Sequence, residues 1–309
     1  MECFILNQDT LFCLPNPMSK PVKHAVDILF RDFEKVFGVR PMVADNEEAV
    51  SVVVRYADRD ETLAGKPECF QITFSETGKM HVTGCDDLGI IYALLYVSEK
   101  YLGVDKFWFW TGKEPERKEK IEIPAVDYTS PRPRVRFRGW FVNDEVCLIG
   151  WTDVYPPPKE VWMPVFETLL RCGGNMVIPG TDLPRTGIHW ELASEMGLYI
   201  THHHAEPLGA EMFFRVYPDK SASYDESKEL YEGLWEEAIK KQKDKKVVWV
   251  FGFRGQGDCP FWENAPEYNT PEKRGELISR VMHRQYEMLC KYVENPPCST
   301  YLYGEITEL

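Results

Sequence analysis

The chain has 309 residues, with 36 Lys and Arg residues against 49 Asp and Glu residues, a formal net charge of −13 and a pI near 5.1. This acidic balance argues against a nucleic-acid-binding protein, because no stripe of basic residues is present to neutralise phosphates. No apolar run approaches the roughly 18 residues that a bilayer span requires, and residues 1–10 lack the charged-then-apolar pattern of a signal peptide. Nine cysteines without a CxxC pair argue against a disulfide framework or a zinc site. We therefore expect a reduced, cytoplasmic protein with no nucleic-acid and no membrane partner.

The first part of the chain alternates helical and strand patterns. Apolar residues of the segment 22–37 recur at helical spacing, and the β-branched run 51–56 is typical of a strand. Residues 70–74 and 79–83 flank the turn sequence of residues 76–78, which predicts a β-hairpin.

Two acidic residues then precede a further helical pattern. Asp86 and Asp87 can cap a helix whose apolar face runs from Ile90 to Tyr101. The aromatic run 107–110 (FWFW) is predicted to close this part of the chain as a strand. Together these elements predict a small N-terminal α/β accessory domain over residues 1–130, which is a normal domain size.

A charged stretch at residues 113–120 and the proline-rich residues 129–133 indicate a linker. Beyond it, strand and helix patterns alternate. The expected strands are 135–142, 175–178, 198–202, 247–253 and 300–303, and the expected helices are 159–171, 189–196, 229–243 and 271–293. This alternation favours a parallel sheet, either in a βα-barrel or in a doubly wound arrangement.

Polar residues gather where four of the five expected strands end. These strand ends are Asn143-Asp144-Glu145, His202-His203-His204-Ala205-Glu206, Arg254-Gly255-Gln256-Gly257-Asp258 and Glu305, whereas the second strand ends in Pro179-Gly180. In a βα-barrel the active site is built at this end of the strands. Carboxylates accompanied by an arginine suit acid/base chemistry on a hydroxyl-rich ligand. A glycosidase uses one carboxyl group to protonate the departing oxygen and a second to activate water or to attack.

Each of these features also has a simpler interpretation. A single acidic residue at a strand end, such as Asp144 or Glu145, often caps the following helix. His202 and His204 share one face of an extended chain, but no further ligand set accompanies them, and we expect no metal site. The glycines around Arg254 form only a GxG pattern without the GxGxxG helix start, so no cofactor is expected.

Longer motifs at these positions resemble those of a known family. Residues 82–96 read VTGCDDLGIIYALLY and residues 138–145 read RGWFVNDE. Shorter matching segments are 166–171 (FETLLR), 175–179 (NMVIP), 193–197 (ASEMG), 204–207 (HAEP), 254–258 (RGQGD) and 303–305 (YGE). In this order the segments resemble motifs of the glycoside hydrolase family 115 α-glucuronidases, and the resemblance covers nearly the whole chain.

The resemblance implies a fold and a reaction. The implied fold is α/β, with the small N-terminal α/β domain followed, over residues 131–309, by the first five βα units of a TIM (β/α)8-type barrel. The implied reaction removes glucuronic acid or 4-O-methylglucuronic acid side chains from xylan or xylo-oligosaccharides by an inverting mechanism with two carboxylates. The expected partner is therefore a carbohydrate substrate, no cofactor and no metal are expected, and a homodimer of the full-length form stays an open alternative.

The resemblance also implies roles for individual residues. Asp258 and Glu305 are the expected catalytic pair, without an assignment of acid and base, and Arg254 is expected to bind the uronate carboxylate through its two-pronged guanidinium. The residues expected to bind sugar hydroxyls are Asn143, Asp144, His203, His204 and Glu206.

Some positions depart from the motifs of the family. Ala205 replaces a histidine, Gln256 an aspartate, Cys259 an acidic residue and Gly304 a lysine. The lost charges can alter substrate choice, and they leave open the alternative of a non-catalytic or vestigial carbohydrate-binding protein on the same scaffold. A complete barrel needs about 250 residues, and fewer remain after residue 133. We therefore expect the 309-residue chain by itself to be marginally stable and inactive on glucuronoxylan.

Overall fold

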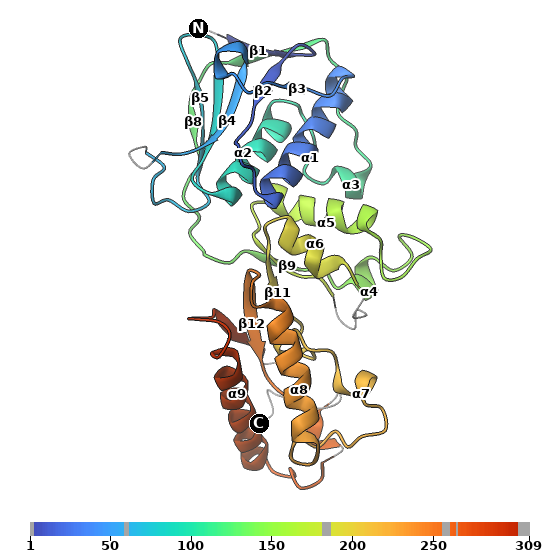
Figure 1. Cartoon of the computed structure of the whole chain (residues 1–309). Helices are drawn as coiled ribbons and strands as arrows, with labels where there is room; N and C mark the ends of the chain where they lie inside the picture. Colours follow the sequence, from blue (N-terminus) through green and yellow to red (C-terminus); the bar gives the residue numbers. More distant parts are fainter. Residues whose placement is uncertain (1–2, 59–61, 181–186, 255–259, 264, 302–309) are drawn as a thin grey trace. The chain divides into compact units, whose positions relative to one another are not determined.

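The computed structural model describes residues 3–58, 62–180, 187–254, 260–263 and 265–301 (Figure 1). The chain is an α/β protein, and its contacts divide it into two compact units. Unit 1 consists of Met1–Gly139, Glu160–Asn175 and Leu192–Leu198, and unit 2 consists of Trp140–Lys159, Met176–Glu191 and Tyr199–Leu309. Among the described residues, no helix is long and apolar enough to cross a membrane.

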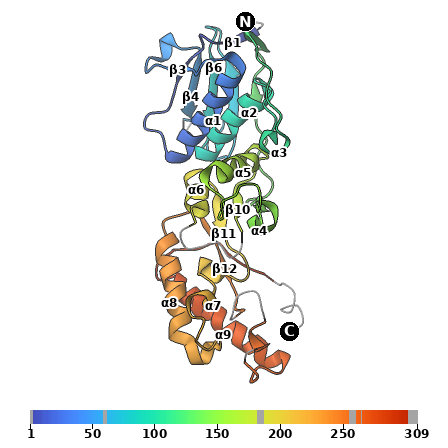
Figure 2. The ribbon, with the colours of Figure 1, turned by 90° about the vertical axis from the view of Figure 1, so that its right-hand side faces the viewer.

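Unit 1 contains a six-stranded mixed sheet and a two-stranded sheet. The larger sheet runs in the order β3 (Met42–Val43), β2 (Leu11–Cys13), β4 (Val52–Tyr56), β6 (Met80–Gly84), β5 (Phe70–Phe74) and β8 (Tyr128–Thr129). The smaller sheet pairs β1 (Cys3–Asn7) antiparallel with β7 (Lys120–Pro124). Figures 1 and 2 show helices α1 (Lys20–Phe37) and α2 (Asp87–Lys100) side by side over the larger sheet, and the short elements of the unit are η1 (Glu47–Ala49) and α3 (Trp108–Thr111).

Local sequence signals account for the main elements of unit 1. The Ser19 side chain accepts a hydrogen bond from the Val22 amide at the start of α1, and Gly38, with φ 83°, ends that helix in the left-handed conformation. The Asp86 side chain accepts a hydrogen bond of 2.8 Å from the Gly89 amide and caps α2. Strands β5 and β6 pair antiparallel. The predicted helix at residues 22–37, the strand at 51–56, the hairpin and the aspartate cap are therefore confirmed.

The prediction of an aromatic strand at residues 107–110 is wrong, because this segment forms the short helix α3. The Trp108 indole N–H donates a hydrogen bond of 2.8 Å to Glu167, and the Arg31 guanidinium lies 4.7 Å from the centre of the Trp108 ring. The aromatic side chains thus satisfy contacts in unit 1 that are distant in sequence, and these contacts outweigh the intrinsic strand preference of the run.

A buried ion network joins α5 (Lys159–Arg171) to α1 in unit 1. The apolar face of α5 is buried, and Glu167 and Arg171 are buried beside it. Arg171 donates to Glu167 at 2.8 Å and also pairs with Asp32, while Arg31 donates to Glu167 at 2.8 Å. Two arginines therefore compensate two carboxylates, which is the condition under which charges are tolerated in a protein interior.

Two residues of the family-like motifs have a structural role in unit 1. The Arg138 amide donates a hydrogen bond of 2.8 Å to the Asn175 side chain, and the Asn175 amide returns one of 2.9 Å to the Arg138 carbonyl. The Arg138 side chain donates to the Gly173 carbonyl at 2.7 Å and pairs with Glu68. These contacts fix the entry to β9 (Gly139–Phe141) and the end of the turn before β10 (Met176–Ile178). They explain why arginine and asparagine stand at these positions.

Unit 2 contains a five-stranded sheet whose strands follow one another in chain order. The strands are β9 (Gly139–Phe141), β10 (Met176–Ile178), β11 (Tyr199–Thr201), β12 (Val247–Phe251) and β13 (Cys298–Thr300). The pairs β10–β11, β11–β12 and β12–β13 are parallel. The helical elements associated with this sheet are α4 (Asp144–Cys147), α6 (His189–Glu195), η2 (Pro207–Gly209), α7 (Phe213–Val216), α8 (Tyr224–Gln242), η3 (Phe261–Glu263) and α9 (Pro271–Leu289).

An aromatic core holds the helices of unit 2 together. The Tyr231 ring of α8 stacks on Phe213 of α7 with 4.0 Å between ring centres, and it meets Phe253, just beyond β12, edge-on at 5.0 Å. Figure 1 shows α8 and α9 running alongside β12, all five residues of which are buried. Because aromatic pairs bury a large apolar area in fixed geometries, this core fixes the strand ends from which the candidate site is built.

Candidate functional site

The described members of the predicted site follow three strands of one sheet in unit 2. Asn143 and Asp144 come directly after β9, the segment His203–Glu206 comes after β11, and Arg254 comes after β12. The two predicted catalytic residues, Asp258 and Glu305, lie outside the described residues. All six described residues therefore lie just beyond the C-terminal ends of strands.

Asp144 is the most deeply buried carboxyl group at these strand ends. Asn143 has φ 53° and ψ 63°, a left-handed conformation that turns the chain from β9 into α4. Asp144 begins that helix and is 0% exposed. Its Oδ1 atom lies against Gly180, where an added Cβ atom would come within 1.6 Å. The glycine at the second strand end, which the sequence marked only as lacking a polar side chain, is thus what makes room for Asp144.

The environment of Asp144 favours its protonated form. Burial raises its pKa to about 7, the neighbouring Glu145 adds to the rise, and the Tyr155 hydroxyl opposes it. Since removing an ionised carboxylate from water without compensation is costly, this group keeps its proton to near-neutral pH.

Glu206 joins Asp144 in what we call the acidic cluster, which consists of Asp144, Glu145, Glu206 and Glu211. The pKa of Glu206 is raised to about 8, chiefly by burial and in addition by the negative charges of Glu145, Asp144 and Glu211. Like charges that share a site cannot all ionise together. The acidic cluster therefore retains at least one transferable proton at neutral pH.

Aromatic rings from three strand ends lie next to one another. The Phe141 ring of β9 is 5.6 Å from His203, the His203 and His204 rings are 3.5 Å apart, and His204 is 6.3 Å from the Tyr301 ring beyond β13. The expectation that His202 and His204 share a face is wrong, because the chain leaves the strand after Thr201 and turns at residues 204–205. His202 instead bonds the side chain of Gln242.

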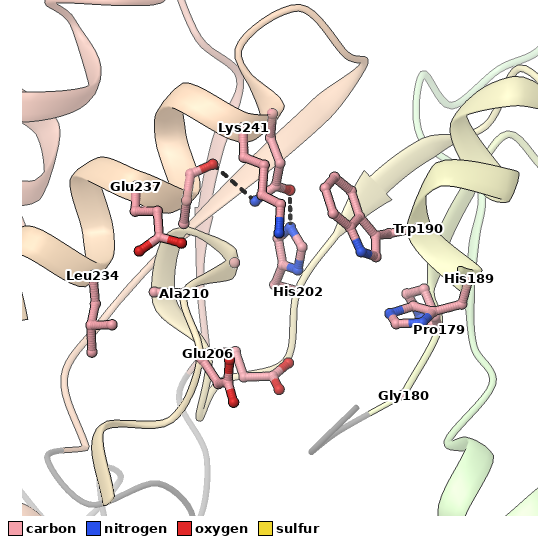
Figure 3. Close-up of a pocket in the computed structure, with 14 residues that line it drawn as sticks. Pro179, Gly180, His189, Trp190, His202, Glu206, Ala210, Leu234, Glu237 and Lys241 are labelled. Carbon is pink, nitrogen blue, oxygen red and sulfur yellow. Dashed lines mark hydrogen bonds between the residues drawn. The ribbon is translucent and has the colours of Figure 1, made fainter. Parts of the chain in front are cut away.

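A cavity of about 100 Å³ opens beside the acidic cluster within unit 2. Its lining includes Glu206, His202, His189, Trp190 and Lys241, and Figure 3 shows the His202 ring between Lys241 and Glu206. Burial lowers the pKa of His189 to about 3 and that of His202 to about 4. Both imidazoles are therefore neutral at physiological pH.

Arg254 supplies the buried cation of the predicted site. Its side chain is 4% exposed, and it directly follows the buried Phe253. Two residues earlier, Gly252 exchanges two hydrogen bonds with the Gln285 side chain. In the part of the chain that the structure describes, no group of three or more His, Cys, Asp or Glu residues is arranged to hold a metal ion.

Sequence reasoning missed several residues that shape this site. Glu211 raises the pKa of Glu206, and the Tyr155 hydroxyl opposes the rise in the Asp144 pKa. Gln242 and Gln285 form hydrogen bonds with the chain near strand ends. None of these four residues belongs to a recognised motif or directly follows a predicted strand. Only the glycine at position 180 carried a usable signal, because a glycine at a strand end often marks a close approach of another group.

Comparisons with known proteins place these observations in a wider context. Residues 130–309 match the model of glycosyl hydrolase family 115. No curated protein matches the chain in a sequence search. The chain resembles the solved structure of BtGH115A, described as a family GH115 4-O-methyl-alpha-glucuronidase with specificity for decorated arabinogalactans, with a TM-score of 0.85 and 24% identity. This match covers 99% of the chain but only 44% of that protein.

Hexosaminidases resemble the chain more distantly. The Streptomyces plicatus N-acetyl-beta-hexosaminidase has a TM-score of 0.62 at 10% identity and matches over 97% of this chain and 62% of its own. The Flavobacterium johnsoniae chitobiase has a TM-score of 0.59 at 12% identity and matches over 97% of this chain and 50% of its own. At these identities the likeness concerns the fold alone.

Proposed function

Because the chain belongs to glycosyl hydrolase family 115, we propose that it removes glucuronic acid or 4-O-methylglucuronic acid side chains from xylan or xylo-oligosaccharides by an inverting mechanism with two carboxylates. The proposal extends to the fold: residues 131–309 are the first five βα units of a TIM (β/α)8-type barrel, and residues 1–130 are an accessory domain. It also includes a cytoplasmic location, a carbohydrate substrate, and no nucleic-acid or membrane partner.

The acidic cluster is the observation that carries the proposal. A sugar hydroxyl both donates and accepts hydrogen bonds, so a sugar-binding site needs side chains that can do the same. The raised pKa values of Asp144 and Glu206 supply protonated carboxyl groups near neutral pH, which can donate as well as accept hydrogen bonds. Hydroxyl-rich sugars suit such a cluster, because carboxylates accept the hydrogen bonds that hydroxyls donate.

The other predicted residues keep their proposed roles. Asp258 and Glu305 are the proposed catalytic pair, and Asn143, Asp144, His203, His204 and Glu206 are proposed to bind sugar hydroxyls. Arg254 is proposed to bind the uronate carboxylate, since a buried guanidinium forms strong two-pronged hydrogen bonds with a carboxylate.

The proposal is tested by adding the purified chain to glucuronoxylan and, separately, to a glucuronate-decorated arabinogalactan, and by measuring the uronic acid released. The binding of free glucuronate is measured in parallel by calorimetry. Arg254→Lys keeps the charge but loses the fork, and we expect it to weaken glucuronate binding by about tenfold or more. Arg40→Lys, an exposed arginine in unit 1, is the matched control and should leave binding unchanged.

Each outcome decides a different part of the proposal. Uronic acid released from glucuronoxylan supports it, and release from arabinogalactan alone supports the reaction but overturns the xylan substrate. Glucuronate binding without release from either polymer fits both the expected inactivity of the 309 residues by themselves and a non-catalytic carbohydrate-binding protein on the same scaffold. A chain that neither binds glucuronate nor releases it contradicts both hypotheses.

A further inference from the structure

Two buried glutamines occupy equivalent places in unit 2. Gln242 lies on α8, the long helix that follows β11, and Gln285 lies on α9, the long helix that follows β12. Their side chains are 3% and 0% exposed. Each reaches back to the chain just beyond the strand that precedes its helix. A buried amide must have its donors and acceptor satisfied, so the partners of these two side chains show what each of them holds.

Gln242 binds the turn that carries Glu206. Its Oε1 atom accepts a hydrogen bond of 2.6 Å from His202 Nε2, since the neutral imidazole is the donor to an amide oxygen. Its Nε2 atom donates to the Ala238 carbonyl at 3.2 Å and to the Leu208 carbonyl at 3.5 Å. Both His202 and Leu208 flank Glu206, so one side chain bonds the turn on each side of that carboxyl group.

The turn itself is shaped to accept this contact. Leu208 and Gly209 have φ values of 59° and 71°, and the Gly209 amide donates a hydrogen bond of 2.9 Å to the Glu206 carbonyl. A Cβ atom on Gly209 would lie 2.5 Å from both Gln242 Nε2 and His202 Nε2. Glycine is therefore required here for its backbone conformation and for the space that the His202–Gln242 pair fills.

Gln285 binds the chain that leads into Arg254. Its Oε1 atom accepts a hydrogen bond of 3.1 Å from the Gly252 amide, and its Nε2 atom donates one of 2.8 Å to the Gly252 carbonyl. Gly252 has φ 157° and is the first residue after β12. The Gln285 side chain thus forms with the Gly252 backbone the two hydrogen bonds that a neighbouring strand would otherwise form. Gly252 lies two positions before Arg254.

We propose that Gln242 and Gln285 are positioning residues of the site: Gln242 fixes the turn that carries Glu206, and Gln285 fixes the chain that leads into Arg254. Glutamine suits both places because it donates and accepts at once without adding a charge beside the acidic cluster. The expected effect of these substitutions on uronate binding rests on the proposed function. Their expected effects on the Glu206 titration and on Gly252 amide exchange do not.

The titration of Glu206 has several charged neighbours besides this contact. The groups that face Glu206 or share its cavity are Asp144 and Glu145 on α4, Glu211 after η2, His189 on α6, Glu237 and Lys241 on α8, and His202 after β11. None of them is changed by substitution of either glutamine. A shift in the Glu206 titration then reports a change in its position rather than a change in its charged surroundings.

The test compares Gln242→Met and Gln285→Met, which keep most of the side-chain volume but remove the hydrogen bonds. Nuclear magnetic resonance follows the carboxyl titration of Glu206, the exchange rates of the Gly252 amide and the Arg254 Nε–H, and the affinity for glucuronate. Gln242→Met should lower the Glu206 midpoint by about one pH unit or more and leave Gly252 exchange unchanged. Gln285→Met should raise Gly252 exchange and weaken glucuronate binding, each by about tenfold, without moving the Glu206 midpoint.

Each variant is thus the control for the other. Two outcomes would overturn the proposal. In the first, both variants lose the same stability and the Glu206 midpoint does not move. In the second, the Glu206 midpoint, the exchange rates and the glucuronate affinity all change in both variants, which would show that the glutamines act only as core residues. The His202 titration of the unmodified chain is an independent test that does not require any variant to fold. His202 should titrate near pH 4, because burial lowers its pKa more than the hydrogen bond to Gln242 raises it, and a midpoint near the ordinary value of about 6.5 would also overturn the proposal. If the unmodified chain does not bind glucuronate, the proposed function fails, and the titration and exchange measurements still decide the positioning roles.

Discussion

The Oδ1 atom of Asp144 fills the space that a side chain on Gly180 would need, so that a Cβ placed there would lie 1.6 Å away from it. Two loops that are 36 positions apart in sequence therefore determine each other's conformation. The carboxyl group is held away from water because the backbone at the end of β10 carries no side chain. The burial that raises the pKa of Asp144 thus depends on a glycine.

This relationship predicts the effect of Gly180→Ala. The methyl group must displace the Asp144 carboxyl group, which should lower the free energy of unfolding by about 1–3 kcal/mol and return the Asp144 pKa from about 7 towards the ordinary aspartate value. Chemical denaturation and a carboxyl titration measure the two effects. Gly233→Ala in α8 is the control, since a Cβ there meets nothing within 4 Å and should stabilise the helix by up to about 1 kcal/mol. An unchanged Asp144 titration in Gly180→Ala would contradict the prediction.

Gly209→Ala separates backbone strain from a steric clash. Gly209 and Gly150 both have positive φ values, 71° and 78°, but a Cβ on Gly209 would meet His202 and Gln242 whereas one on Gly150 would meet nothing within 4 Å. In both variants the left-handed backbone conformation should lower the free energy of unfolding by about 1–2 kcal/mol. The steric clash in Gly209→Ala should lower it by about 1–3 kcal/mol more. If denaturant unfolding shows equal losses of stability in Gly209→Ala and Gly150→Ala, the turn can move to relieve the steric clash with His202.

Substitution of Arg171 should destabilise unit 1 strongly. The Arg171 side chain is 0% exposed and lies between Asp32 and Glu167, which are 1% and 2% exposed. Arg171→Met leaves buried carboxylates with one arginine, Arg31, and should cost about 3–5 kcal/mol. Lys20→Met removes an exposed pair with Glu195 and should cost no more than about 1 kcal/mol. Comparable losses in thermal unfolding would contradict the importance assigned to the buried network.

The acidic cluster should make stability depend on pH in a defined direction. The folded pKa of Glu206, about 8, lies above its usual value, so the folded state binds more protons between the two values. Stability from this group is then fully present below about pH 4 and is lost as the pH rises towards 8. Glu206→Gln should therefore match the unmodified chain near pH 4 and exceed its stability at pH 8 by a few kcal/mol.

The control for this prediction lies on the same unit. Glu232 pairs with Arg284, and its pKa is held below the usual range by that hydrogen bond. Glu232→Gln should therefore be less stable than the unmodified chain at pH 8, whereas Glu206→Gln should be more stable. If Glu206→Gln gave no advantage at pH 8, Glu206 would be an ordinary ionised carboxylate and the acidic cluster would hold no extra proton.

The sequence by itself determined the elements whose signals are local. Helix α1 begins where Ser19 caps it and ends where Gly38 takes a left-handed conformation, and strands β5 and β6 meet at a turn of predicted type. These features need only neighbouring residues, because capping, turn geometry and hydrophobic periodicity are properties of a few consecutive positions. The loops that bear Asp144, Glu206 and Arg254 could be found for the same reason, since each directly follows a predicted strand.

Only the tertiary structure decided which groups those loops meet. The FWFW run forms a helix because Trp108 finds Glu167 and Arg31, and Asp144 is buried because Gly180 leaves it room. The raised pKa of Glu206 comes from Glu145, Asp144 and Glu211 together with burial, and its turn is bonded to a glutamine more than thirty positions away. Burial, electrostatic repulsion and long-range hydrogen bonds depend on distances between residues that are remote in sequence, and those distances exist only once the chain has folded.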